Sequence, residues 1–227
     1  MGFESVLGQV SLFSHLPNES VEALGKQLQH RRYDREQIIF HKNDPGSTLY
    51  IIISGKVKIL LPSPEGENVI VALLSTGEFF GELSLFDGAP RSATAVSADS
   101  TEILTLDKDD FNRYLLDNPR VALIILSELS LRMRRTDELL SDAAFCNLAT
   151  RLAKRLMELA HRYGQPGANG AIRINLRLKQ QDLADMSGAT RESVNKVLKM
   201  LKEQRLIQWS KGIITLLDPA VMRHKAR

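Results

Sequence analysis

The sequence predicts an α+β protein in which an antiparallel β-sandwich or jelly roll precedes a long helix and a small basic helical domain. The chain has 227 residues and 43% hydrophobic content, enough for one large domain or two small ones. Its first half carries short β-type segments divided by turn residues, and its second half has helical periodicity. Through residue 146 there are 14 Lys and Arg against 21 Asp and Glu, and beyond it 16 against 6. This asymmetry favours a polyanionic partner for the second half, the alternative being a basic tail without a specific role.

Composition excludes several classes of protein. The longest apolar stretches, 49–53 and 121–126, are far shorter than the ~20 residues of a membrane span. The first 16 residues lack the basic start of a signal peptide. The single cysteine, Cys146, excludes an internal disulfide and an all-cysteine metal site, and the five histidines show no metal-ligand spacing. We therefore expect a soluble cytoplasmic protein with no metal and no membrane partner.

The first half is expected to begin with helix and continue as strands. Residues 1–30 have helical character, with Asn18 as a cap for a segment that carries Val21, Leu24 and Leu28. Six strand-like segments follow, separated by groups rich in Gly, Pro, Asn and Asp: residues 38–40, 49–53, 57–61, 69–73, 93–96 and 103–106. Many short strands with regular turns are typical of an antiparallel sandwich or jelly roll.

A long helix is predicted over residues 119–144. Asn118 and Pro119 have the residue types of an N-cap and a first helical position. Apolar spacings of 3 and 4 then predict a two-stranded coiled coil between two copies, along a seam of Leu126, Leu129, Met133, Thr136, Leu140 and Ala143. The alternative is a single helix that packs on its own domain. Asn147 is expected to cap the next helix.

Residues 179–202 carry the pattern of a helix-turn-helix. Leu183, Ala184 and Met186 lie on a first helix, Gly188 permits a tight turn, and Thr190 can cap a second helix. The second helix has a buried stripe (Val194, Val197, Leu198, Leu201) and an opposite polar face (Arg191, Glu192, Asn195, Lys196, Lys199). Arg can bind guanine in bidentate fashion and Glu can accept from cytosine, so this face suits the DNA major groove. The alternative is a solvated face with a Glu192–Lys196 pair.

A basic hairpin completes this domain as a winged helix. Residues 206–210 and 213–217 read as two strands joined at Lys211 and Gly212. The predicted DNA contacts are therefore Lys179, Gln180, Thr190, Arg191, Glu192, Asn195, Lys196, Lys199 and Lys211, with Lys199 assigned to phosphate.

Residues 81–95 combine the parts of a phosphate pocket. Gly81 opens a short helical turn that includes Leu83 and Ser84, and its free N–H groups can face an anion. Arg91 supplies a fixed cation and Ser92 a hydroxyl donor. Glu82 would repel phosphate but suits a ribose hydroxyl, so the set predicts a sugar phosphate with one phosphate charge. The alternative is a structural Glu82–Arg91 salt bridge.

Three segments, FGELSLFDGAPRSATA, ISGKVKI and GATRESVNKVLKML, resemble the cyclic-AMP receptor protein/FNR (Crp/Fnr) family of bacterial transcription regulators. The resemblance extends over about residues 10–217 in the right order. It implies a cyclic-nucleotide-binding β-roll over 1–118, a dimerisation helix over 119–144 and a winged helix-turn-helix DNA-binding domain over 145–227. It further implies a homodimer on pseudo-palindromic double-stranded DNA with TGTGA-like half-sites, cAMP as effector and RNA polymerase as a partner. No nucleophile–base motif is visible, so we expect no enzyme activity.

The resemblance also implies roles for particular residues. Gly81, Glu82, Arg91 and Ser92 would hold the cyclic phosphate and the ribose 2′-hydroxyl, and Thr136 would meet the base. Arg191, Glu192 and Lys196 fall on the base-reading positions, although Lys196 stands where the cyclic-AMP receptor has arginine. Cys146 alone is incompatible with the iron–sulfur cluster of the FNR branch.

Asp137 leaves the effector open, because the cyclic-AMP receptor has a serine there, contributed by the partner subunit. A carboxylate matches the adjacent N1–H and N2–H₂ donors of guanine better than the single amine of adenine. The family resemblance favours cAMP, this carboxylate favours cGMP, and another effector or none stays open. A regulatory subunit of an enzyme is the alternative from a different class of protein.

Overall fold

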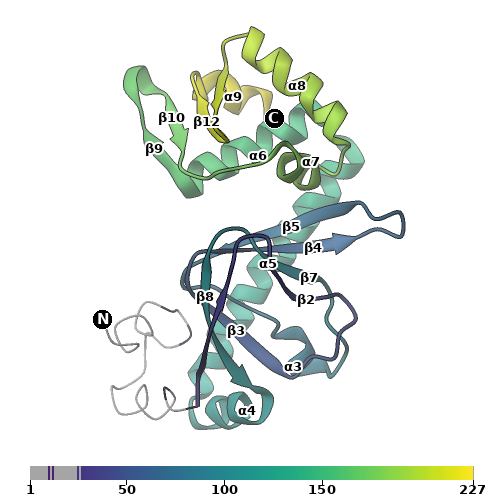
Figure 1. Cartoon of the computed structure of the whole chain (residues 1–227), viewed down its shortest axis with the longest axis vertical. Coiled ribbons are helices and arrows are strands. Elements are labelled where there is room, and N and C mark those ends of the chain that lie inside the picture. Colours follow the sequence, from purple (N-terminus) through teal and green to yellow (C-terminus); the bar gives the residue numbers. More distant parts are fainter. Residues whose placement is uncertain (1–9, 11, 13–24, 26, 227) are drawn as a thin grey trace. The chain divides into compact units, whose positions relative to one another are not determined.

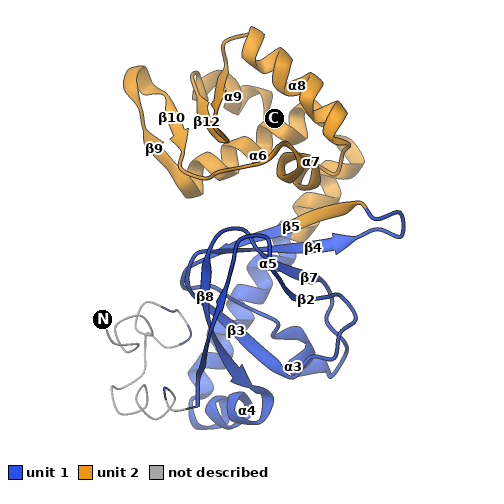
Figure 2. Cartoon of the chain, viewed as in Figure 1, with its two compact units in different colours: residues 1–66, 71–135 blue, residues 67–70, 136–227 orange. Residues whose placement is uncertain are grey.

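The structure is a computed structural model that describes residues 10, 12, 25 and 27–226 (Figure 1). These residues fall into two compact units, one within 1–66 and 71–135 and the other formed by 67–70 and 136–226 (Figure 2). Most of the helix expected within residues 1–30, including its cap at Asn18, lies outside the described residues.

The first unit is a sandwich of two four-stranded sheets. One sheet has the order β1-β8-β3-β6, with β1 Gln29–Tyr33, β8 Thr101–Asp107, β3 Thr48–Ser54 and β6 Phe79–Phe80. The other has the order β2-β7-β4-β5, with β2 Ile38–Phe40, β7 Thr94–Ser97, β4 Lys56–Pro62 and β5 Asn68–Ser75, of which residues 68–70 are counted with the second unit above. The β1–β8, β3–β8, β3–β6, β2–β7 and β4–β7 pairs are antiparallel. All six expected strands form, and the predicted antiparallel sandwich is confirmed.

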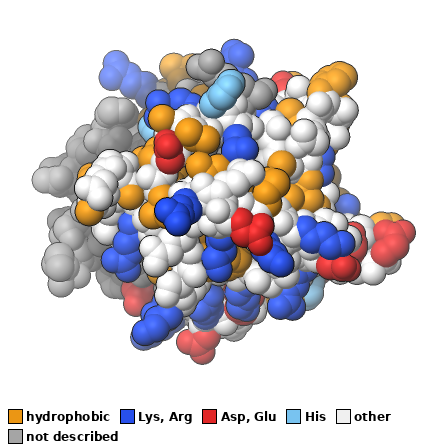
Figure 3. Space-filling view, turned by 90° about the horizontal axis from the view of Figure 1, so that it is seen from above, with side chains coloured by type: hydrophobic (Ala, Val, Ile, Leu, Met, Phe, Trp, Pro, Cys, Tyr) orange, Lys and Arg blue, Asp and Glu red, His pale blue; other side chains and the backbone are white. Residues whose placement is uncertain are grey.

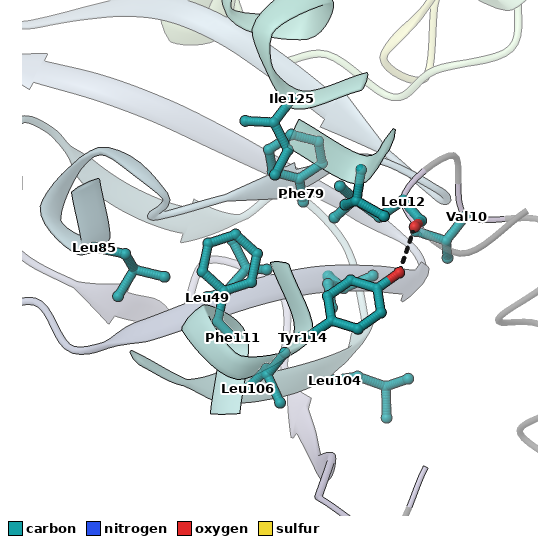
Figure 4. Packing of buried hydrophobic residues seen from close by; sticks show 12 residues of the cluster. Val10, Leu12, Leu49, Phe79, Leu85, Leu104, Leu106, Phe111, Tyr114 and Ile125 are labelled. Atoms are coloured by element: carbon teal, nitrogen blue, oxygen red, sulfur yellow. Dashed lines mark hydrogen bonds between the residues drawn. The ribbon is translucent and has the colours of Figure 1, made fainter. Parts of the chain in front are cut away.

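Alternate side chains of β3 and β8 pack into an apolar core, which helices cover on one side (Figure 4). Leu49 and Leu106 pack there with Phe111 from α4 (Lys108–Asp117). Tyr114, also on α4, donates its hydroxyl to the carbonyl of Leu12 at 2.8 Å. Burial raises the pKa of this phenol above its ordinary value, so the group keeps its proton and remains a donor.

The expected helix over residues 1–30 is wrong at its C-terminal end, because Gln29 and His30 belong to β1. This strand lies at the edge of its sheet, and four of its five residues are exposed. Its sequence, QHRRY, therefore shows no apolar alternation from which a strand could be predicted. Strand β6 is only two residues long and was not expected either.

Helix α5 (Pro119–Phe145) begins at the predicted proline and continues from the first unit into the second. In the second unit, α6 (Leu148–Tyr163) is capped by Asn147, whose side chain accepts from the Thr150 N–H at 3.0 Å. Helices α7 (Gln180–Ser187) and α8 (Arg191–Glu203) form the predicted helix-turn-helix. No described helix has the length and apolar character that a membrane crossing requires.

A small sheet and a last helix complete the second unit. The sheet has the order β11-β12-β10-β9, with β11 Ile207–Ser210, β12 Ile213–Leu216, β10 Ile172–Ile174 and β9 Gly164–Pro166. The β11–β12 hairpin is the predicted wing. The 3-10 turn η1 (Ala168–Gly170) joins β9 to β10, and α9 (Pro219–Lys225) buries Met222.

Candidate functional site

The predicted phosphate pocket is built around the backbone of Gly81, which precedes the short helix α3 (Leu83–Asp87). Gly81 has φ +81°, and a Cβ there would lie 2.7 Å from Nη1 of Arg91. A Cβ on Gly46 would lie 3.0 Å from Nε of Arg91 and closer still to Ser84. Both positions therefore require glycine for the backbone to approach the arginine side chain.

Arg91 is a buried cation held by carbonyls and aromatic rings. Only 4% of the residue is exposed, and its guanidinium carbon lies 4.5 Å from the ring centre of Phe40 and 5.4 Å from that of Tyr50. It donates to the carbonyls of Gly81 at 2.7 Å and Thr48 at 2.9 Å. Burial lowers the pKa of this guanidinium and raises that of the Tyr50 phenol.

The guanidinium of Arg91 has further N–H donors beyond those that the two carbonyls accept from. Arg has five N–H donors, and two of them meet the carbonyls described above. Nε is buried and finds no acceptor among the described residues. A buried cation with an unpaired donor fits an anionic group, so these residues suit a ligand with a single phosphate charge.

Glu82 is also buried, with 3% exposure. Its ion-pair partner, Arg132, is a residue that the sequence does not predict at this site. Oε1 of Glu82 accepts from Nη1 of Arg132 on α5 at 2.9 Å, and Arg132 also donates to the carbonyl of Phe79. The alternative of a Glu82–Arg91 salt bridge is wrong, because the ion pair that Glu82 makes among the described residues is with Arg132. No spacing in the sequence connects two residues so far apart in the chain.

The other predicted nucleotide contacts fall into two groups. Ser84 is buried near Arg91, whereas Leu83 and Ser92 are exposed on the same segment. Thr136 and Asp137 are exposed on α5, in the second unit. Their roles toward a base stay predictions.

Helix α5 exposes large apolar side chains along one face. Leu123, Leu126, Met133 and Leu140 are 68%, 58%, 69% and 70% exposed, and helical geometry places them within about 100° of one another. Leu129, expected in the same seam, instead packs against the core of the sandwich. The exposed face is therefore centred on Leu126, Met133 and Leu140, and Asp137 lies on it.

The polar face of α8 is open to solvent. Thr190 caps the helix as predicted, accepting from the Ser193 N–H at 3.3 Å. Val194, Leu198 and Leu201 are buried and Val197 is half-buried, which confirms the predicted stripe. On the exposed face Lys196 lies 3.3 Å from Glu192, and Lys199 lies 3.9 Å from Glu203. The ion pair expected for a solvated helix face is thus present, and exposed pairs of this kind are weak.

Gln180 connects the two helices of the helix-turn-helix. Its Oε1 accepts from Nε of Arg191 at 3.1 Å and from Nδ2 of Asn195 at 3.0 Å. Lys179, the residue before it, is exposed, and its backbone N–H donates to Asp182 at 2.7 Å.

The wing hairpin turns at Lys211 and Gly212, whose φ angles of 51° and 79° fit a tight two-residue turn. A cleft of about 310 Å³ lies on this sheet, lined by Arg173, Arg177, Gln208, Ser210, Lys211, Ile213 and Thr215. Three of these side chains are cationic and none is a carboxylate. Arg173 and Arg177 were not predicted, because each is a lone cation before the helix-turn-helix. Lys and Arg side chains are also more prominent than Asp and Glu on the face drawn in Figure 3.

Comparisons with known proteins identify both units. Residues 30–118 match a family model described as "Cyclic nucleotide-binding domain", and residues 150–225 match one described as "Crp-like helix-turn-helix domain". A "CRP-like cAMP-activated global transcriptional regulator" of Mycobacterium tuberculosis is 34% identical over 99% of this chain and 100% of its own length. The chain belongs to the Crp/Fnr family. It is a cyclic-nucleotide-binding, DNA-binding transcription regulator.

Other Crp/Fnr proteins agree with this assignment. A "Cyclic AMP receptor protein" of Thermus thermophilus is 31% identical over 95% of this chain and 96% of its own length. The solved structure of a c-di-GMP responsive global regulator of Xanthomonas campestris has a TM-score of 0.78 and 25% identity, and the match covers 89% of this chain and 100% of that one. The Mycobacterium and Xanthomonas proteins are both named as global regulators. Among the described residues, no group of three or more His, Cys, Asp or Glu could hold a metal ion.

Proposed function

We propose that this Crp/Fnr protein is a homodimer that binds cAMP in its first unit and a pseudo-palindromic DNA site through its second. The observation that carries the ligand half of the proposal is Arg91, a buried guanidinium whose Nε has no acceptor among the described residues. The cyclic phosphate has one negative charge, which this guanidinium would neutralise.

The remaining pocket residues have complementary roles in this proposal. The exposed hydroxyl of Ser92 donates to a phosphate oxygen, and the N–H groups at Leu83 and Ser84 face the same anion. Glu82 accepts from the ribose 2′-hydroxyl while Arg132 holds its carboxylate in place. The nucleotide supplies no reaction, and it acts by binding two arrangements of the protein with different affinities.

On DNA, each subunit would place α8 in one major groove. Arg191, Glu192 and Lys196 are exposed and reach base edges, once the weak Glu192–Lys196 pair separates. Lys179, Thr190, Lys199 and Lys211 are exposed cations or hydroxyls that suit phosphates. Two-fold symmetry then requires half-sites about one helical turn apart. RNA polymerase is a further partner in this proposal and the cytoplasm is the proposed location, since the proposed target is bacterial DNA.

The identity of the base is the open part of the proposal. The names of the Mycobacterium and Thermus relatives support cAMP, whereas the Xanthomonas regulator is named for c-di-GMP. Asp137 favours cGMP if its carboxylate meets the base edge.

One titration tests the function and the effector together. Calorimetry gives the affinities of the wild type and of Asp137→Ser for cAMP and cGMP, and fluorescence anisotropy follows binding to a duplex with two TGTGA-like half-sites. We expect the wild type to prefer cAMP and to bind the duplex more tightly with cAMP than without it. A preference for cGMP that Asp137→Ser abolishes would replace cAMP by cGMP. No effect of either nucleotide on DNA affinity would contradict nucleotide control.

A further inference from the structure

We infer that Gln180 is a positioning residue for sequence readout, which presets the side chains of Arg191 and Asn195 on the recognition helix. This inference rests on the proposed DNA-binding function of α8. It assigns to Gln180 a role through other residues in place of its predicted contact with DNA.

The geometry is a single acceptor shared by two donors. Oε1 of Gln180 lies 3.1 Å from Nε of Arg191 and 3.0 Å from Nδ2 of Asn195. Arg191 and Asn195 are one turn apart on α8, while Gln180 is the first residue of α7. One amide oxygen on the first helix therefore fixes two polar side chains on the second. Gln180 is itself half-buried, so its own side chain has less freedom than an exposed one.

The hydrogen bond to Gln180 determines which edge of the Arg191 guanidinium is available to a base. Arginine can present either its Nε edge or its terminal Nη1–Nη2 edge to the O6 and N7 acceptors of guanine. Because Nε is engaged by Gln180, the terminal edge is the one left for a base. Holding this long side chain in one orientation before binding also removes part of the entropy cost of ordering it on DNA.

The consequence for Asn195 is an orientation of its amide. With Nδ2 donating to Gln180, its Oδ1 faces away from that acceptor and can accept a hydrogen bond. Base pairs read near Asn195 should thus be selected for a donor, such as the amine of cytosine or adenine.

Three variants of the full-length protein test this role. Gln180→Met keeps the length of the side chain and removes the acceptor, and Gln180→Glu keeps an acceptor oxygen and adds a negative charge. Gln181→Met is the matched control, because Gln181 is the next residue of α7, is exposed and bonds to Asp185 at 2.7 Å. Affinity is measured by anisotropy, with the preferred nucleotide, on duplexes substituted at each half-site position, and Arg191→Ala identifies the base pair that Arg191 reads.

We expect Gln180→Met to reduce discrimination at that base pair about three- to tenfold, with unchanged affinity for unrelated DNA, salt dependence and Tm. Gln180→Glu should retain the discrimination while binding every duplex more weakly, because the added charge repels phosphate. Gln181→Met should match the wild type.

Two results would overturn the inference while the proposed function stands. If Gln180→Met weakens binding equally on all duplexes, Gln180 is a phosphate contact. If it changes nothing, the two hydrogen bonds have no part in readout. Failure of the wild type to bind any duplex would instead contradict the proposed DNA-binding function, and the inference would fall with it.

Discussion

Arg91 has two roles, because the side chain that suits a phosphate ligand also stabilises the walls of the pocket. Its guanidinium joins the carbonyls of Gly81 and Thr48 and covers the rings of Phe40 and Tyr50. A lysine at this position keeps the charge but lacks the planar fork that reaches two carbonyls at once. Ligand affinity and stability of the sandwich should therefore depend on the same residue.

Arg91→Lys should lower the affinity for the preferred cyclic nucleotide by about 10- to 100-fold and also lower Tm in the absence of ligand. Ser92→Ala is the control, since Ser92 is the exposed neighbour, and it should reduce affinity by less than tenfold without changing Tm. Calorimetry and thermal unfolding measure both quantities. If Arg91→Lys binds the nucleotide as tightly as the wild type, Arg91 does not hold the phosphate.

At the scale of elements, the sequence predicts what periodicity and capping encode. Elements that depend on neighbours in the sequence all form as expected. They are the six strands, the start of α5 at Pro119 and the N-caps of α6 and α8. Edge strand β1 is polar on its exposed positions and was therefore missed. The Arg132–Glu82 and Gln180–Arg191 contacts connect separate elements, so no local pattern could predict them. The candidate pocket was thus predicted from one contiguous segment, but without the arginine that α5 brings to it.

The junction of α5 and α6 contains another contact between elements. Asp142, 5% exposed near the end of α5, lies 2.5 Å from Nζ of Lys154 and 2.8 Å from Nη2 of Arg155, both on α6. The hydrogen bond to Asp142 raises the pKa of Lys154. The Lys154–Asp142 pair therefore stabilises the folded state fully at pH values below the ordinary lysine pKa of 10.5. This contribution to stability is lost as the pH rises through the raised pKa of Lys154 in the folded state.

Asp142→Asn should destabilise the second unit by about 1–2 kcal/mol, because Lys154 loses its buried counter-charge and Arg155 keeps only its exposed partner Glu158. Urea unfolding followed by the fluorescence of Trp209 measures this, since the chain has one tryptophan and it lies in β11. The control is Glu158→Gln, which removes the exposed partner of Arg155 at 2.7 Å and should change stability by less than about 1 kcal/mol. Equal small effects of the two variants would show that the Asp142 cluster does not stabilise this junction.

For the whole molecule, the decisive feature is the exposed apolar face of α5. The side chains from Leu123 to Leu140 extend over about 25 Å of helix, and globular proteins seldom leave such a continuous apolar stripe uncovered. A second copy of the same helix would cover it in the two-fold arrangement that the proposed pseudo-palindromic DNA site requires. Dimerisation would then join two weak half-site contacts into one strong contact.

Replacing Met133 and Leu140 together by Lys should therefore produce a folded monomer. Like charges would face each other across the two-fold axis, and the affinity for the two-half-site duplex should fall on the order of 100-fold or more. Leu116→Lys is the control, because Leu116 is a leucine that is 83% exposed on a different helix, α4, and its variant should stay dimeric. Analytical ultracentrifugation gives the mass, circular dichroism verifies the fold, and anisotropy gives the DNA affinity. A double variant that remains dimeric at micromolar concentration would place the dimer interface elsewhere than on α5. A monomer with undiminished affinity would show that the two half-sites are not read as a linked pair.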